Sequence, residues 1–465
     1  MMKRYILILV SLFAVLSAVD AQAPLTAYHS DSFILRHRLN PAFTPEYDHI
    51  SLPLLGCTSL SLESSMGMGS LIFDRPDGTL SLFTSSGTIS KDELMKKVGG
   101  GLNFGAEAVA TLISYGRHAS EDCYRTLDVT LHAAADAHVD RSVFDMVKDV
   151  ENRSYTLGNT GLSASSWLDI SVGETDRIDE HWTIGGRLKF LIGLMNADLR
   201  LNRMNLNLLN AQGPAPAWTA DGDVSMAVAG FDYTKEYKTY QSRPGGYTQV
   251  KGISRGGLGI RGFGIGTDLG VAYRMDDRWT FSASLLDLGF ITWYGSRKAV
   301  SSGSHFVFDG FQNLSADDAD PNGFKNQWNR LKDDIADLMR LEEVEKTART
   351  NMLNMTFALG ATCQLQPVTL GGLFTTRTHY GFSDIEWRFS AEVAPFSDWN
   401  FALSPAFVIY DNPRTQRFAL GAMVSYHPGR YNFYIASDNL FFRVNRQLIP
   451  TSLNGGIMFG AAMYL

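Results

Sequence analysis

The sequence predicts an all-β fold, a transmembrane antiparallel β-barrel of about 14 strands. The number of alternating segments can be counted to within roughly 12 to 16 strands. Three observations predict it. Segments of about ten residues alternate apolar and polar side chains, aromatic residues recur at their ends, and short polar turns alternate with long polar loops. The composition agrees, because 43 glycines, 28 Phe, 18 Tyr and 8 Trp beside only 19% charged residues are typical of strand-rich proteins with aromatic girdles.

Residues 1–21 are predicted to be a cleaved signal peptide. Lys3 and Arg4 precede an apolar run that ends near Leu16, and small residues follow around Ala21, which is the order of charge, apolar core and cleavage site in secretory signals. The run is too short to cross a bilayer as a helix, and no later stretch reaches the roughly 20 apolar residues that such a helix needs. The predicted location is the outer membrane of a Gram-negative cell.

Residues 22–48 are predicted to be ordered, irregular chain ahead of the barrel. In the stretch ArgLeuAsnProAlaPheThrPro, Asn40 before Pro41 favours a turn, and Pro45 keeps the segment out of a central strand. A plug, or hatch, at the barrel mouth and a plain N-terminal tail both agree with this pattern.

The barrel is predicted to extend from residue 49 to residue 465. A polar turn at 176–181 joins two alternating segments, 161–173 and 182–194, each with one apolar and one polar face. The C-terminal third repeats the pattern at 355–365, 385–393, 399–410, 418–426, 431–436 and 457–465. Most of these segments exceed the about five or six residues of an average strand, which favours a barrel over a soluble sandwich whose apolar face would be its interior.

The glycines of GlyPheGlyIleGly, from Gly262 to Gly266, are predicted to begin a barrel strand and not to hold a nucleotide phosphate. A phosphate loop needs a helix directly after its glycines. Here the period-two alternation continues to Arg274, a polar turn follows, and a second alternating segment starts at Trp279. The sequence therefore predicts a hairpin in which small residues ease curvature.

Two stretches interrupt the alternation. Residues 214–261 are polar and rich in tyrosine, so they are predicted to form a long exposed loop. Residues 296–351 are predicted to be a helical insertion, over the barrel mouth or inside the lumen, between a hairpin ending near Trp293 and a strand starting near Leu353. Its amphipathic helix, of roughly six turns, is identified by apolar residues at alternating spacings of four and three: Phe324, Trp328, Leu331, Ile335 and Leu338.

The polar faces of the predicted strands supply candidate lumen residues: His132, Asp136, His138, Arg187, Lys189, Glu386, Arg388 and Glu392. Alternate residues of one strand lie about 7 Å apart, so a single strand rarely gives a metal ion more than two ligands. Neither a metal nor a cofactor is predicted. Hydrogen bonds across a hydrated lumen are the expected role of these side chains.

No enzymatic activity and no catalytic residue is predicted. GxSxG is not found between a strand and a helix, where a serine hydrolase needs it, and an enzyme barrel with a triad spread over several strands is left as a third alternative. The formal net charge of −7 provides no basic footprint for nucleic acid. Three widely spaced cysteines, without a CxxC pair, suit neither a disulfide framework nor a structural zinc site.

The sequence resembles known outer-membrane barrels. AsnProAla at 40–42, shortly after a signal peptide and ahead of a glycine- and aromatic-rich barrel, resembles FadL-type proteins, whose N-terminal hatch carries this motif. GlyIleGlyThrAspLeuGlyValAlaTyrArg at 264–274 and SerAlaSerLeuLeuAspLeuGlyPhe at 282–290 are similar to uncharacterised Bacteroidota barrels, filed as a domain of unknown function and related to FadL-type fatty-acid transporters and PorV-like barrels. This resemblance covers most of the mature chain.

The resemblance implies a small hatch that carries Asn40, Pro41 and Ala42, and passage or binding of small hydrophobic ligands. The alternative function is a non-transporting barrel that serves as a structural or secretion-associated envelope partner, docked through the insertion helix. The C-terminal strand resembles a signal for the barrel-assembly machinery, although it ends on Leu465 in place of Phe or Trp. The expected partners are outer-membrane lipid, a hydrophobic ligand, the barrel-assembly machinery and an envelope protein.

Overall fold

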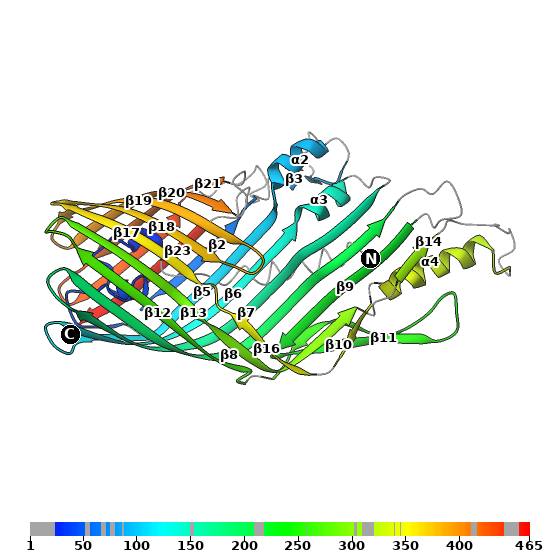
Figure 1. Ribbon diagram of the computed structural model, residues 1–465, viewed down its shortest axis with the longest axis horizontal. Coiled ribbons are helices and arrows are strands. Elements are labelled where there is room, and N and C mark those ends of the chain that lie inside the picture. The colour runs from blue at the N-terminus through cyan, green and yellow to red at the C-terminus, as the bar shows by residue number, and fades with distance from the viewer. Residues whose placement is uncertain are drawn as a thin grey trace.

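The computed structural model (Figure 1) describes residues 24–51, 56–66, 71–74, 80–85, 88–148, 153–208, 218–257, 259–301, 305–308, 320–338, 340–344, 346–410, 416–440 and 455–465. The predicted signal peptide, 1–21, lies outside these residues. Within the described ranges, no helix has both the length and the apolar content that crossing a bilayer demands.

The strands form a closed antiparallel barrel with 14 positions in its wall, as the sequence predicted. β1 (His49–Ser51) and β2 (Thr58–Ser64) share the position between β5 (Gly101–His118) and β23 (Gly455–Tyr464), and this seam closes the ring. From β5 the ring continues through β6 (Cys123–Asp140), β7 (Ser154–Arg177) and β8 (Trp182–Asn207).

The next wall positions are each built from more than one strand. β9 (Trp218–Ala229) and β12 (Gly262–Arg274) pair with opposite halves of β8. The next position is formed by β13 (Trp279–Ser301), which pairs with both β12 and β9, and by β14 (His305–Phe308), which pairs with β9. β15 (Leu341–Glu343), β16 (Thr347–Met352) and β17 (Thr356–Leu365) then share one position beside β13. The ring is completed by β18 (Val368–Thr378), β19 (Ser383–Phe396), β20 (Trp399–Tyr410), β21 (Gln416–Tyr426) and β22 (Tyr431–Asn439).

The two ends of the barrel differ (Figure 1). Short turns and the C-terminus lie at one end. At the other end lie the small sheet of β3 (Ile72–Asp74) and β4 (Leu80–Leu82), and the helices α2 (Lys91–Val98), α3 (Arg141–Lys148) and α4 (Phe324–Leu338). We call these the short-turn end and the long-loop end.

The polarity of the wall is the reverse of that in a soluble sandwich. On β8, Leu188 and Phe190 are 46% and 49% exposed, whereas the alternating Arg187 and Lys189 are 6% and 5% exposed. The same alternation places apolar side chains on the outer face of most other strands and charged side chains in the lumen. An exposed apolar face around a polar interior is the pattern of a barrel that contacts lipid.

The stretch 214–261 is not the long loop that the sequence predicted. It contains β9 in the wall and a hairpin of β10 (Phe231–Thr239) and β11 (Gly246–Arg255). Polar residues dominate these strands because the hairpin extends beyond the wall towards α4 (Figure 1), and most of its residues are partly or fully exposed. A polar composition alone therefore gave the wrong secondary structure.

The insertion predicted at 296–351 is shorter than expected. β13 continues to Ser301 because Gly295, at φ 61°, forms a bulge that reverses the alternation and hid the strand in the sequence. The wall resumes after α4 with β15 at Leu341 and β16 at Thr347, and not near Leu353. α4 has 15 residues, about four turns in place of six, and lies beyond the wall at the long-loop end, outside the lumen (Figure 1).

The seam between β1 and β23 predicts a specific disulfide. Ile50 is paired with Met463, and opposite residues in an antiparallel ladder have Cα atoms about 4.5–5.5 Å apart, within the span of a disulfide. With the native cysteines replaced by serine, Ile50→Cys with Met463→Cys should form an intramolecular disulfide, detected as faster migration on a non-reducing denaturing gel. Ile50→Cys with Ile457→Cys is the control. Equal cross-linking of the two pairs would contradict the closed ring.

Candidate functional site

Residues 24–48 lie inside the barrel at its short-turn end and are called the hatch (Figure 1). The hatch has two short 3-10 turns, Leu25–Ala27 and Arg36–Arg38, joined by irregular chain. Phe33 and Leu35, at 0% exposure, are part of an apolar cluster that the hatch shares with the inner wall. The hatch is thus packed as a core and does not trail as a loose tail.

The AsnProAla motif fixes the hatch to the wall. The Asn40 side chain accepts a hydrogen bond from the backbone N–H of Ala42 at 2.9 Å and donates one to the Ala283 carbonyl at 3.2 Å. The Thr175 hydroxyl donates to the Pro41 carbonyl at 2.6 Å. Asn40 is fully buried, so these bonds satisfy polar groups that would otherwise be costly to bury.

Two wall glycines allow the motif to approach the strands. A Cβ atom at Gly185 would lie 2.0 Å from the Pro41 carbonyl oxygen, and one at Gly270 would lie 2.1 Å from Asn40 Oδ1, and real Cβ contacts essentially never fall below 3.0 Å. The hatch therefore depends on the absence of side chains at these positions.

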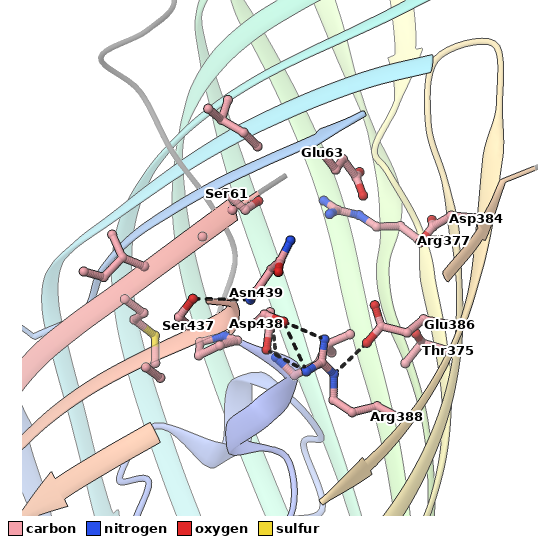
Figure 2. Close-up of a pocket in the computed structure, with 18 of the residues that line it drawn as sticks. Ser61, Glu63, Thr375, Arg377, Asp384, Glu386, Arg388, Ser437, Asp438 and Asn439 are labelled. Atoms are coloured by element: carbon pink, nitrogen blue, oxygen red, sulfur yellow. Dashed lines mark hydrogen bonds and ion pairs between the residues drawn. The ribbon is translucent and has the colours of Figure 1, made fainter. Parts of the chain in front are cut away.

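The start of the hatch is held by a buried ion cluster (Figure 2). The backbone N–H groups of Leu25 and Thr26 donate to the two oxygens of Asp438 at 2.9 and 2.8 Å. Arg388 lies beside Asp438, donates to the Thr26 hydroxyl at 3.2 Å, and pairs with Glu386 at 2.6 Å. Of the predicted lumen residues, Arg388 thus contacts the hatch directly and Glu386 is linked to it through Arg388. Glu392 also contacts the hatch, by accepting a 2.9 Å hydrogen bond from Ser30.

A second group of charges crosses the lumen beside the hatch. It runs through His37, Asp128, Arg187, Asp268, Lys189 and Asp287. His37 Nε2 lies 3.1 Å from Asp128, and Arg187 bridges Asp128 and Asp268 at 2.5 and 3.0 Å. Removing Arg187 would leave Asp128 without its cation, whereas Asp268 would keep Lys189 at 2.8 Å, and breaking a buried pair in this way typically costs about 3–5 kcal/mol.

Two cavities lie on either side of the hatch. The inner cavity, about 650 Å³, faces the short turns and is bordered by Asp31, Arg36 and Phe43 of the hatch. The outer cavity, about 580 Å³, faces the long-loop end, and none of its described lining residues belongs to the hatch. The hatch and the two charge clusters lie between these two cavities.

The outer cavity has an apolar and a polar side. On its apolar side, Trp167, Ile291, Trp293 and Leu353 belong to one apolar cluster. Its polar side includes Arg200, Asp136 and Tyr380. His132 lines the same cavity and stacks on Trp167 with 5.0 Å between ring centroids, whereas His138 is buried beside Asn103.

Sequence reasoning missed several lumen residues. Asp128 and Asp268 lie on polar strand faces, but their partners are 59 and 81 residues away, so no local spacing links them to Arg187. Glu63, His379 and Asp384 form a further cluster whose members come from β2, the turn after β18 and the start of β19. A turn histidine directly before a tyrosine-glycine pair gave no distinguishing signal.

Burial changes the titration of the hatch histidines. Burial lowers the pKa of His29 to about 4, because its charged form would lose hydration. Burial also lowers the pKa of His37, although the neighbouring Asp128 carboxylate offsets part of that effect. Both rings are therefore neutral at pH 7 while the hatch is docked.

Comparison with protein families gives one match, which extends over residues 41–438. The chain belongs to a family of unknown function (DUF5723). This agrees with the resemblance to barrels filed as a domain of unknown function. A search of curated proteins found no match.

Among solved structures, similar chains include FadL-type barrels. A FadL homologue from Pseudomonas aeruginosa is 10% identical, with 91% of each chain covered and a TM-score of 0.42. The toluene transporter TbuX of Ralstonia pickettii is 10% identical, with 96% of this chain and 100% of that chain covered and a TM-score of 0.40. The toluene transporter TodX of P. putida is 10% identical, with 94% of each chain covered and a TM-score of 0.38.

Gly185→Ala should release the hatch. Its new Cβ would overlap the Pro41 carbonyl, whereas a Cβ at the adjacent Gly186 would meet its nearest neighbour, the Asp268 carbonyl oxygen, at 3.9 Å. Hydrogen exchange across residues 24–48 should therefore become at least tenfold faster in Gly185→Ala and stay unchanged in Gly186→Ala. Equal exchange in both variants would show that the hatch does not rely on this contact.

Acid should also loosen the hatch. The pKa of His29 is about 4 when docked and near 6.5 when released, so its contribution is complete above pH 6.5 and falls about tenfold per pH unit down to pH 4. The protection factors of the hatch amides, which correct for the slower intrinsic exchange at low pH, should fall over this window, and less steeply in His29→Asn. His305→Asn, at an exposed position on β14, is the control. The same pH profile in wild type and His29→Asn would contradict this assignment.

Proposed function

We propose that the protein is an outer-membrane β-barrel that binds a small amphipathic ligand in its outer cavity, above a hatch that closes the lumen. The outer cavity carries this proposal. Its volume of about 580 Å³ falls inside the roughly 300–1,000 Å³ of small-molecule sites, and apolar walls with a few convergent polar groups are typical of such sites.

The outer face supports a membrane location. Apolar side chains alternate outward around the wall, while ionised residues point into the lumen, and a lipid bilayer is the surrounding that satisfies both faces. In bacterial outer-membrane barrels the short turns face the periplasm and the long loops face outward. This rule would place the hatch on the periplasmic side and the outer cavity towards the cell exterior.

The two sides of the cavity favour an amphipathic ligand. The tryptophan side offers apolar and aromatic contact area for a hydrophobic body. On the other side, the Arg200 guanidinium lies over the Tyr380 ring, 5.1 Å from its centroid, and suits an acceptor or anionic group. The hydrophobic ligand expected from the sequence is therefore proposed to carry one polar end.

Passage into the periplasm would require movement of the hatch. Ala42 of the AsnProAla motif lines the charged inner cavity and not the outer one. FadL-like passage of a hydrophobic molecule through this lumen would thus be gated. A docked hatch corresponds to the closed state of the proposed channel.

A second function, an envelope partner without transport, is favoured by the projecting elements. The tip of the β10–β11 hairpin docks on α4, where the Asp333 carboxylate accepts the N–H groups of Gln241 and Ser242 at 2.8 and 2.7 Å. Phe324 and Trp328 on α4 are 55% and 43% exposed. A rigid arm with exposed aromatic residues suits contact with another protein, at the cell surface given the proposed orientation.

Ligand binding is tested by what purifies with the protein. Outer membranes should yield a heat-modifiable, β-rich species, and mass spectrometry of its extract should show a bound amphiphile. Arg200→Ala should lower the bound amount at least tenfold, because it removes the polar anchor. Arg203→Ala, whose side chain is 66% exposed on the same strand, should not.

The outcomes separate the two functions. Loss of the amphiphile in Arg200→Ala alone supports binding in the outer cavity. A folded wild-type barrel that carries no amphiphile, or one that Arg200→Ala leaves unchanged, would reject this site and favour the partner function. Fractionation with soluble or inner-membrane proteins would overturn the location.

A further inference from the structure

We infer that Glu63, His379 and Asp384 form a binding site for a divalent transition-metal ion such as Zn²⁺ inside the lumen. His379 Nε2 lies 3.1 Å from Glu63 Oε1 and 3.1 Å from Asp384 Oδ1. The three ligand atoms lie within 4.8 Å of one another. A tetrahedral ion with bonds of about 2.0–2.1 Å holds its ligands about 3.3 Å apart, so the cluster needs little movement to bind one.

The orientation of the histidine ring supports the site. His379 Nδ1 lies 3.0 Å from Asp136 Oδ1, and Asn354 donates to the other Asp136 oxygen at 2.9 Å. When Nδ1–H donates to Asp136, Nε2 carries the lone pair that can bind a metal ion. A metal-binding histidine commonly donates its other ring N–H to a carboxylate, which fixes the orientation of the ring. The ring also stacks on Phe382, 4.4 Å between centroids, which fixes its plane.

The carboxylates of the cluster favour a cation, although Arg377 and Arg417 also act on Glu63 electrostatically. Three carboxylates, Glu63, Asp136 and Asp384, surround one imidazole, while the neighbouring Arg377 bonds to a different carboxylate, Glu107. In the neutral ring with Nδ1 as donor, the Nε2 lone pair faces two carboxylate oxygens. A proton on Nε2 supplies a single N–H for both oxygens, whereas a divalent ion bonds to all three atoms.

A further oxygen lies beside the cluster. Tyr410 is the cross-strand partner of Asp384, is 1% exposed, and its hydroxyl has no hydrogen-bond partner among the described residues. Its hydroxyl interacts electrostatically with Glu63 and Asp384. Buried hydroxyl groups are normally satisfied, and a metal ion with a bound water would provide the missing partner.

The chain makes room for these ligands and leaves a path to them. A Cβ at Gly105 would lie 2.7 Å from Glu63 Oε1, so the carboxylate lies directly over this glycine. Asp136 and His379 border the outer cavity, and Glu63 and Asp384 border a smaller pocket of about 100 Å³ (Figure 2). The proposed ligands therefore border both cavities.

The sequence predicted no metal because it considered one strand at a time. The ligands proposed here come from three places in the chain, β2, the turn after β18, and β19. Asp136, which the sequence identified as a lumen residue, acts behind the ligands and not as one of them. A bound ion would join three parts of the wall across the lumen and hold the β18–β19 turn in place.

The test is zinc binding by the purified full-length barrel. After treatment with EDTA and dialysis against micromolar Zn²⁺, elemental analysis should find one zinc per chain, and Co²⁺ substitution should give the visible absorption of a four-coordinate site. His379→Ala should abolish binding, and Asp136→Asn should weaken it about 10–100-fold. His118→Ala, which removes an exposed histidine at the short-turn end, should bind as wild type does.

Two controls distinguish loss of zinc binding from failure of a variant to fold. Each variant must show heat-modifiable migration, and Zn²⁺ should raise the unfolding temperature of wild type but not of Glu63→Gln, which keeps the side-chain size and loses the charge. Absence of zinc from folded wild type, or full binding by folded His379→Ala, would overturn the site. Neither result depends on whether the outer cavity binds an amphiphile.

Discussion

The structure depends on closure of the backbone hydrogen-bond ladder. An outer face of exposed apolar side chains leaves no water to satisfy a free strand edge, so every edge must find a neighbour. The pairing of β1 and β2 with β23 meets this demand and sets the number of wall positions. The number of strands fixes the width of the lumen, and an interior of this width is too large to be filled by wall side chains alone. A hatch that packs as a core fills part of the remaining space.

The interior follows from the same constraint. Because apolar residues are used on the outer face, the inner face consists of polar and charged residues, and each buried charge needs a partner. The hatch supplies some partners directly, as His37 does for Asp128 and as the N–H groups of its first turn do for Asp438. The charged lumen and the hatch are therefore one polar network, and the position of the hatch determines which carboxylates are satisfied.

The sequence predicted the regular parts of this arrangement and missed the irregular ones. Period-two alternation located β12 and β20 at their observed bounds, because both run without a bulge that shifts a face outward. The alternation failed at β13, because the bulge at Gly295 turns the following side chains to the opposite face of the strand. It also failed at β10–β11, where most residues are partly or fully exposed. The polar residues of single strands were identifiable, but His379 comes from a turn and meets Asp136 across 243 residues. Such pairs are set by the closed ring and not by spacing along the chain.

The split wall position shared by β9 and β12 has a consequence for how this fold can vary. Ala229 and Gly262 pair with Asn196 and Gly193, only three residues apart on β8, so the chain leaves and rejoins the wall at almost the same place and in the same direction. Everything between, including the β10–β11 hairpin, is an excursion that the barrel does not need for its own closure. Evolution can lengthen, exchange or delete such an excursion while the ring of strands stays intact. Closure of the wall is thus a requirement of the fold, whereas the outward hairpin is not needed for it.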